Sequence, residues 1–139
     1  RPVPYTSAAS FYDNGLSQEN LFRIQSDAIR KAADESSCVF VGRCADYVLR
    51  DNPNMVTVFI TADLDDRISN VCKRRNCSAE EARKLIEDKE STRSSYYNYY
   101  SGKTWGASAS YDLCVNASRL GAEGTKEFIA EFIRRRMKR

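Results

Sequence analysis

Apolar residues recur three and four positions apart in several segments of the chain, which is the spacing of one helix face. Ser17 is a suitable N-cap for the first of these segments, and Asp63 for a later one. Ser78 and Glu81 have the spacing of a capping box, in which each side chain satisfies a free amide of the other residue. The predicted helices cover residues 18–34, 43–50, 64–72, about 79–97 and about 122–137.

Three other segments are short and continuously apolar, which predicts strands buried on both faces, as in a parallel sheet. They cover residues 38–42, 56–61 and 111–116. Residues 38–61 are therefore predicted to form a β-α-β unit, and strands that alternate with helices predict an α/β layered fold. Three strands make a small sheet, and an additional strand supplied elsewhere would make a more ordinary one.

The remaining segments carry the signals of loops and turns. Residues 1–16 contain two prolines and an Asp-Asn-Gly turn signal, which predicts a loop or a flexible arm. Residues 99–108 form an aromatic stretch with glycines, and residues 117–121 form a turn before the last helix. The chain has no internal repeat, and residues 1–139 are predicted to form a single domain.

Composition narrows the class of protein. The 139 residues are 42% hydrophobic and 29% charged, as expected for one globular domain with a core. No apolar run approaches the roughly 20 residues of a membrane span, so no membrane partner is predicted. The chain opens on Arg1 without an initiator Met or an apolar signal segment, which gives secretion no support and indicates a piece of a longer product. The absence of histidine excludes Ser-His-Asp hydrolysis, Cys-His proteases and histidine-ligated zinc.

The charge balance argues against nucleic acid as a partner. The net charge is +3 and the pI is about 8.6, whereas nucleic-acid binding domains usually have a pI above about 9 and a clustered basic face. The one basic block, residues 134–139, ends the predicted last helix. We interpret it as favourable charge at a helix C-terminus rather than as a contact for nucleic acid or lipid.

Five cysteines are present, an odd number, and no CxxC pair occurs. Two of them, Cys38 and Cys114, lie inside apolar runs. This pattern favours buried or half-buried free thiols in the reducing cytoplasm and argues against a structural zinc site. Cys44, just after a predicted strand, is an alternative candidate for a reactive thiol, but no histidine is present to activate it.

Gly42 and Arg43 follow the first predicted strand, and ligands of open α/β sheets bind beyond the carboxyl ends of the strands. Glycine permits close approach of a ligand, and a guanidinium binds a phosphate through two parallel hydrogen bonds. The alternative is a surface arginine that pairs with Asp46 or Asp51. Spacing alone does not decide between the two interpretations.

Lys89 and Arg93 are four residues apart, so they share one face of a predicted helix that is rich in charge. Such a row is usually solvated surface, paired here with Glu87, Asp88 or Glu90. The alternative is a mobile lid that closes cations onto a polyphosphate, since phosphoryl transfer requires charge neutralisation and exclusion of water. The tyrosine-rich run at 96–100 is equally compatible with a packed hinge and with an interface.

The combination of several motifs resembles the cytidylate kinase-like family of P-loop nucleoside monophosphate kinases. The resemblance runs from about residue 17 to the C-terminus and includes a lid pattern over about residues 73–108. It is carried by Gln25, CVFVGRCADYVL at 38–49, VFITA at 58–62 with Asp66 and Arg67, DKESTRSSYYNYY at 88–100 before GKTWG at 102–106, and YDLCVN at 111–116.

The resemblance implies a parallel-sheet, three-layer P-loop fold with a helical lid. It also implies transfer of the ATP γ-phosphoryl group to CMP, dCMP or a similar nucleotide, with Mg²⁺. Lys89 and Arg93 would be the catalytic lid cations, and no residue is assigned as a metal ligand. Arg43, Asp46 and Arg67 would bind substrate: Arg43 would hold the monophosphate, and Arg67 would orient the lid or touch ATP.

The chain departs from the family pattern in two places. Cys44 stands where the family usually has an aspartate after the arginine, and Asp46 comes two residues later, so recognition of base or sugar is expected to differ. The family's first strand and its glycine-rich phosphate loop have no counterpart in residues 1–139 and are expected upstream. The alternatives are a nucleotide-binding or regulatory module that has lost catalysis, and a structural subunit that uses the tyrosine run as an interface.

Overall fold

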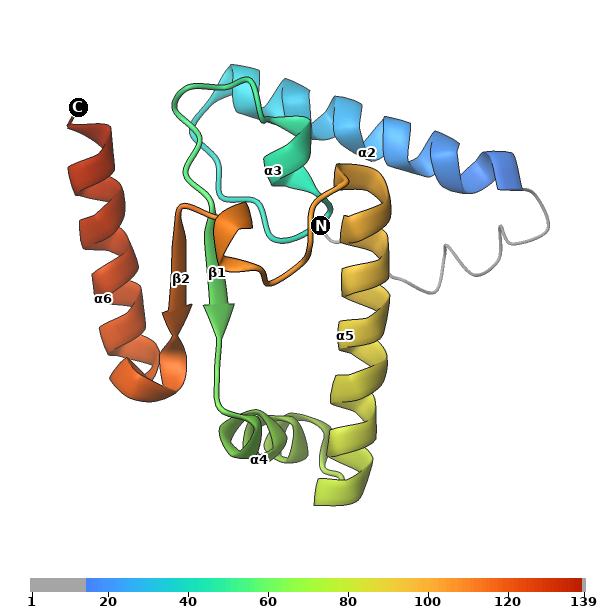
Figure 1. Cartoon of the computed structure of the whole chain (residues 1–139), viewed down its shortest axis with the longest axis vertical. Coiled ribbons are helices and arrows are strands. Elements are labelled where there is room, and N and C mark those ends of the chain that lie inside the picture. Colours follow the sequence, from blue (N-terminus) through green and yellow to red (C-terminus); the bar gives the residue numbers. More distant parts are fainter. Residues whose placement is uncertain (1–14, 139) are drawn as a thin grey trace. The chain divides into compact units, whose positions relative to one another are not determined.

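The computed structural model describes residues 15–138, which divide into two compact units, one up to Asn52 and one from Pro53 (Figure 1). The predicted arm lies outside the described residues, except that residues 15 and 16 belong to a helix. Within residues 15–138, no helix has the length and apolar character needed to cross a membrane. The single-domain organisation stays a prediction.

The first unit is built from helix α2 (Gly15–Glu35) and the short helix α3 (Ala45–Val48). The predicted helix over 18–34 is confirmed, but Ser17 lies inside α2 and is not its cap. The predicted helix over 43–50 is reduced to the four residues of α3, because the residues before Ala45 adopt left-handed backbone angles that a right-handed helix cannot include.

The predicted strand over 38–42 is wrong for the described part of the chain. Residues 38–41 belong to no helix or strand, and the side chains of Val39 and Val41 are 94% and 91% exposed. A strand exists only when a neighbour pairs with its backbone, and residues 15–138 supply none here. The β-α-β unit predicted over 38–61 is therefore absent, although the apolar run that suggested it is present.

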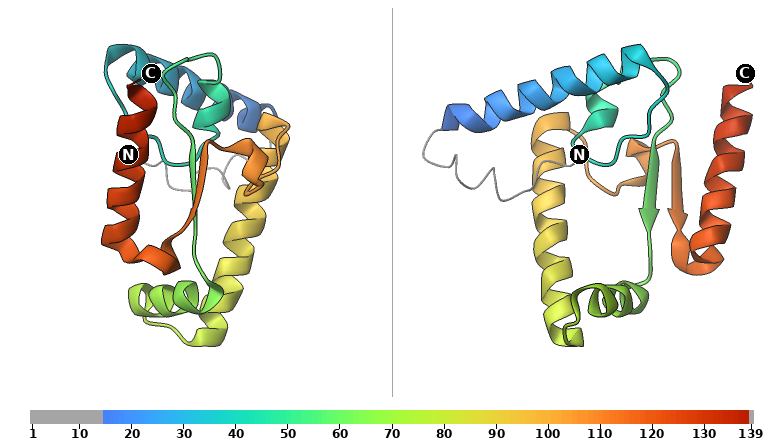
Figure 2. Two further views of the ribbon diagram at one scale, coloured as in Figure 1. Left: turned by 60° about the vertical axis from the view of Figure 1, so that its left-hand side comes forward. Right: turned by 180° about the vertical axis from the view of Figure 1, so that it is seen from behind.

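The second unit contains a small parallel sheet of β1 (Val58–Thr61) and β2 (Leu113–Asn116), the two strands found among residues 15–138. Val58 pairs with Leu113 and Thr61 with Asn116, and Figure 2 shows the strands side by side. The strands begin at a hydrogen-bonded clamp. The Thr57 N–H donates to the Asp112 carboxylate (2.9 Å), and the Asp112 N–H donates to the Thr57 hydroxyl (2.8 Å). The fold is a mixed α/β one with a parallel sheet, as predicted, but it is mostly helical.

In the described part of the second unit, the sheet is accompanied by three helices, α4 (Leu64–Arg75), α5 (Ala79–Ser101) and α6 (Ala117–Met137), and by the 3₁₀ turn η1 (Ser108–Ser110). Helix α5 extends four residues beyond the predicted end at Tyr97. The turn predicted over 117–121 survives as a break inside α6, because Gly121 has φ 72° and ψ 174°. This conformation favours glycine.

Helices α4 and α5 form a corner that contains the best-buried cluster of the second unit. Ile68 of α4 packs against Ala82 and Ile86 of α5, with Ala82 fully buried. The chain turns between the helices at Asn76, whose left-handed backbone (φ 51°, ψ 52°) ends α4. The corner therefore fixes the direction of α5 from its first turns (Figure 2).

The capping box predicted at the start of α5 is confirmed. The Glu81 N–H donates to the Ser78 hydroxyl (3.1 Å), and the Glu81 carboxylate accepts from the Ser78 N–H (3.4 Å).

We expect Ser78→Ala to lower the free energy of unfolding by about 0.5–2 kcal/mol, because an amide of the first turn of α5 loses its partner. Urea unfolding measures the change. Ser95→Ala, at an exposed position of the same helix, should leave stability nearly unchanged, and equal losses would contradict the cap's contribution.

An aromatic cluster holds the other end of α5. Tyr97 is buried and stacks with Tyr111 (ring centroids 6.2 Å apart), and Phe59 of β1 contacts Tyr111 (5.0 Å) and Trp105 (5.1 Å). Gly106, at φ 79°, lies against the Phe59 ring, where an added Cβ would be 3.4 Å from a ring carbon. Helix α5 is thus anchored at both ends, at the α4 corner and at this cluster.

Candidate functional site

The turn that carries Arg43 has an unusual backbone. Gly42, Arg43 and Cys44 are three consecutive residues with φ of 71°, 59° and 55°. For a non-glycine residue, the left-handed conformation costs roughly 1–2 kcal/mol, and such residues cluster at functional sites. The turn is closed by the Ala45 N–H, which donates to the Gly42 carbonyl (3.2 Å), and it leads directly into α3. The chain thus presents the half-buried Arg43 on a strained turn.

Asp46 and Cys44 lie next to that turn and have local roles. An oxygen of the Asp46 carboxylate accepts the Tyr47 N–H (2.8 Å) in the first turn of α3. Cys44 is 3% exposed, and its burial, with a smaller effect of Asp46, raises the pKa of its thiol to about 12. The thiolate is the reactive form of cysteine, so the alternative of Cys44 as a reactive thiol loses support.

The other cysteines match the prediction of buried or half-buried free thiols only in part. All five are free; Cys72 and Cys77 are half-buried, and Cys38 and Cys114 are exposed. Cys38 is exposed because its segment forms no strand. The sequence gives no signal for this difference, since both exposed thiols lie in apolar runs.

Arg67 links α4 to α5. Its guanidinium forms an ion pair with the carboxylate of Glu90 (2.6 Å), and both side chains are partly exposed. Glu90 lies between Lys89 and Ser91 on α5, so Arg67 holds the segment of α5 that carries the predicted lid cations. Of the two roles that the resemblance implies for Arg67, orientation of this helix is the one that its contact supports.

Lys89 and Arg93 share a face of α5 with the residues that anchor it. At about 100° per residue, the positions 82, 86, 89, 90, 93 and 97 fall within an arc of roughly 100°. Ala82, Ile86 and Tyr97 on this arc are buried, whereas Lys89 and Arg93 are exposed. The two cations therefore lie between two buried anchor points, on the side of the helix that faces the rest of the unit. The opposite side of the helix is exposed along its length, at Lys84, Asp88, Ser91 and Ser95.

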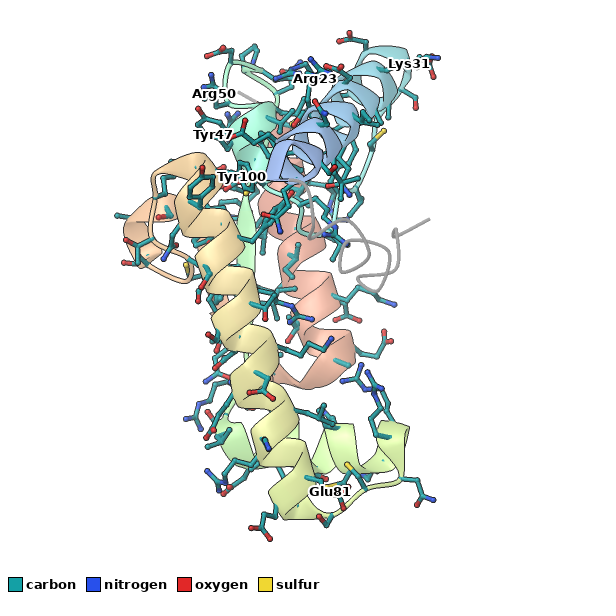
Figure 3. All side chains as sticks on the ribbon, turned by 90° about the vertical axis from the view of Figure 1, so that its right-hand side faces the viewer. Arg23, Lys31, Tyr47, Arg50, Glu81 and Tyr100 are labelled. Atoms are coloured by element: carbon teal, nitrogen blue, oxygen red, sulfur yellow. The ribbon has the colours of Figure 1, made fainter. Side chains whose placement is uncertain are left out.

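Other charged residues of α5 occupy that opposite side. Lys84 is exposed and lies about half a turn away from the arc of buried residues. Figure 3 shows α5 with Glu81 at its beginning and Tyr100 near its end. The tyrosine run is likewise divided. Tyr97 is packed in the aromatic cluster, while Tyr99 is 72% exposed and its ring contacts that of Tyr100 at 4.8 Å.

A polar cluster at the carboxyl ends of β1 and β2 was missed by the sequence interpretation. Asp63, predicted as a cap of α4, makes no capping hydrogen bond with its side chain. Its carboxylate accepts from the Asn116 amide (3.0 Å) and pairs with Arg119 (3.6 Å), while its N–H donates to the Ser118 hydroxyl (2.8 Å). The sequence contained one signal for this cluster, because polar residues follow both strands. They lie at the edge where ligands of parallel sheets bind.

The predicted site residues fall into two groups. Arg67, Lys89 and Arg93 are brought together on the α4–α5 pair of the second unit. Arg43 and Asp46 belong to the first unit, on the left-handed turn and the start of α3. The α4–α5 group contains three cations, and the other group contains one cation, Arg43, on a fixed turn; guanidinium groups are suited to binding phosphate.

The chain is similar in sequence and in structure to known proteins. The sequence pattern of the cytidylate kinase-like family matches residues 4–119. A cytidylate kinase of Methanopyrus kandleri is 29% identical over 104 aligned residues, with 69% of this chain and 54% of that protein covered. The crystal structure of an uncharacterized protein from Eubacterium ventriosum matches with a TM-score of 0.78 and 32% identity, covering 81% of this chain and 64% of that one.

The chain spans about half of the Methanopyrus protein and less than two thirds of the Eubacterium protein. The family pattern, in contrast, extends over most of the chain, from residue 4 through both strands and the whole α4–α5 pair. This protein belongs to the cytidylate kinase-like family.

Proposed function

We propose that this chain is part of a kinase that transfers the γ-phosphoryl group of ATP to CMP, dCMP or a similar nucleoside monophosphate. Membership of the cytidylate kinase-like family supports a phosphotransferase. The observation that carries the proposal is the position of Lys89 and Arg93 on the core-facing side of α5. Phosphoryl transfer depends mainly on positioning and charge neutralisation, which cations in such a position supply.

The remaining residues receive roles that follow from their surroundings. Arg43 is assigned to the phosphate of the acceptor nucleotide, because a guanidinium on a strained, fixed turn can bind it through two hydrogen bonds. Asp46 stays a proposed substrate-binding residue beside it. Arg67 is a positioning residue, because its contact is with Glu90 and so with the helix that carries Lys89 and Arg93.

ATP and Mg²⁺ are the co-substrate and the cation that the proposal implies. Exposed cations of α5 fit the charge of a polyphosphate. Among residues 15–138, no group of three or more Cys, Asp or Glu side chains is placed to hold a metal ion, so Mg²⁺ would arrive with the phosphates of ATP. The proposal also requires a glycine-rich phosphate-binding loop, which the printed sequence does not contain, and a larger parallel sheet than the two strands found within residues 15–138. We place the activity in the cytoplasm, as the cysteine pattern favours.

A second candidate function is a nucleotide-binding or regulatory module without catalysis. A full-length coding sequence without a glycine-rich phosphate loop would favour it. The two candidates differ in one measurement, because both bind a nucleoside monophosphate but only the kinase converts ATP to ADP when the acceptor is present.

We expect CMP to raise the melting temperature of the full-length protein, and ATP with Mg²⁺ to raise it further. A ligand at about 100 times its Kd adds about 2.7 kcal/mol of stability. Arg43→Ala should remove most of the CMP effect and lower kcat/KM about 10–150-fold, since a hydrogen bond to a charged group contributes about 1.5–3 kcal/mol. Thermal shift and ADP release measure the two effects.

Arg50→Ala is the matched control for this experiment. Arg50 is an exposed arginine of the same unit that stacks over the Tyr47 ring at 4.1 Å. It should leave CMP binding and ADP release at wild-type levels. Unchanged kinetics in Arg43→Ala would remove the assigned role of Arg43, and CMP binding without any ADP release would favour the non-catalytic module.

A further inference from the structure

Two cysteines meet where α4 ends. Cys72 lies in the last turn of the helix, and Cys77 follows the left-handed residue Asn76. The Cys77 N–H donates to the Cys72 carbonyl (3.4 Å), and the Asn76 N–H donates to the same oxygen. In many helix endings the residue after the left-handed one donates its N–H to a carbonyl of the last helical turn. The side chains of the donor and acceptor residues are then frequently in contact. At this ending, both positions are cysteine.

The two thiols also lie close together. Both side chains are half-buried against the same cluster of Ile68, Ala82 and Ile86, and Cys72 is near enough to raise the pKa of the Cys77 thiol. A disulfide requires Cα atoms about 4.4–6.8 Å apart and side chains that converge. A direct main-chain hydrogen bond between the residues brings their backbones close, and packing against the same cluster directs both side chains to one side.

We propose that Cys72 and Cys77 are a redox modification site that closes reversibly into a disulfide when the protein meets a peroxide. The thiolate of one cysteine attacks a peroxide oxygen, which breaks the O–O bond and leaves a sulfenic acid and, for hydrogen peroxide, one water. The second thiol attacks the sulfenic sulfur, which forms the S–S bond and releases a second water. The two sulfurs lose two electrons in total, and the peroxide gains them.

The surroundings of Cys77 bear on the order of the two attacks. Burial raises the pKa of the Cys77 thiol, and the neighbouring Cys72 and Glu81 raise it further. Because the thiolate is the attacking species, this shift disfavours Cys77 as the first attacker. Thiol reductants reverse the reaction by exchange at the disulfide.

The other three cysteines lack this arrangement. Cys44 is buried, with a pKa raised to about 12. Cys38 is exposed, and its sulfur makes its described contacts with Ser36 and with the Ala32 carbonyl. Cys114 is exposed on β2. Oxidation therefore selects the 72–77 pair by proximity. The second thiol lies beside the sulfenic acid in the same molecule, so its effective concentration there is far higher than that of an exposed thiol that must first meet its partner.

The disulfide would act on the α4–α5 corner, because it joins the last turn of α4 to the residue that precedes the Ser78 cap of α5. The disulfide would close a ring of residues 72–77, which contains Lys73, Arg74 and Arg75. Trypsin cleaves the chain after these residues, so in oxidised protein the two peptides that contain the cysteines stay linked until the disulfide is reduced. The linked peptides are therefore a direct measure of the disulfide.

The experiment treats reduced full-length protein with equimolar hydrogen peroxide, blocks the remaining thiols and digests without reductant. We expect a linked 72–77 peptide pair as the main product, lost on addition of dithiothreitol. Cys72→Ser and Cys77→Ser should each abolish it, and Cys77→Ser should accumulate a sulfenic acid at Cys72 that a 1,3-diketone probe labels. The double variant Cys38→Ser, Cys114→Ser is the matched control and should retain the linked pair in full. Absence of the linked pair from the wild-type digest, or equal yields of bridges to Cys38 or Cys114, would overturn the proposal.

Discussion

Replacing Arg93 with alanine is expected to lower kcat by about a thousandfold, the lower end of the effect of arginines that stabilise a transferring phosphoryl group. The KM for the nucleoside monophosphate should change far less, because in the role proposed for Arg93 the charge that it meets develops in the transition state. Arg93 is exposed on the core-facing side of α5, one turn beyond the Arg67–Glu90 ion pair. Steady-state release of ADP by the full-length protein measures both parameters.

Two further variants separate this role from a general effect of charge. Lys84→Ala removes an exposed cation from the opposite side of the same helix, so kcat should stay at the wild-type value. Arg93→Lys keeps the charge but not the planar fork, so it should recover only part of the lost rate. A wild-type kcat in Arg93→Ala, or equal losses in Arg93→Ala and Lys84→Ala, would show that Arg93 belongs to a solvated surface.

The second large effect is on stability. Ile86→Ala should lower the free energy of unfolding of the second unit by about 2–4 kcal/mol, because it leaves a cavity between α4 and α5. Ile86 is 7% exposed and packs against Ile68 and the fully buried Ala82. For a chain of this length the melting temperature should fall by roughly 7–14 °C. Thermal and urea unfolding, followed by circular dichroism, measure the change.

Ile60→Ala is the matched control for that substitution. It removes the same atoms from a β1 side chain that is 54% exposed, so it should cost less than about 1 kcal/mol. Equal losses at the two positions would mean that the α4–α5 corner is not the stabilising cluster of the unit.

The features that the sequence predicted correctly are those whose partners are close along the chain. Ser78 and Glu81 form a capping box within one turn, so their own spacing was sufficient evidence. The helices α2, α4 and α5 follow from local periodicity, and the break at Gly121 follows from the freedom of glycine at positive φ. The common face of Lys89 and Arg93 likewise followed from their four-residue spacing alone.

The features that escaped prediction depend on distant partners. The apolar run around Val39 and Val41 indicates a strand, but a strand also needs a neighbour, and pattern alone does not supply one. The Arg67–Glu90 pair requires the packing of α4 on α5, and the contacts of Asp63 require β2 to end beside β1. The left-handed angles of Arg43 and Cys44 have no signal in residue type, because neither residue favours them.

The parallel pairing of β1 with β2 also governs when the second unit can be completed. Thr57 and Asp112, which join the starts of the two strands, are 55 positions apart. The entropic cost of closing a loop grows with its length, and pairings this distant form late in folding. The α4–α5 corner lies inside that loop and is held by contacts between near neighbours, so it can form first and shorten the distance to be closed. During synthesis, the backbone of β1 must therefore remain without its partner until residues 113–116 have left the ribosome.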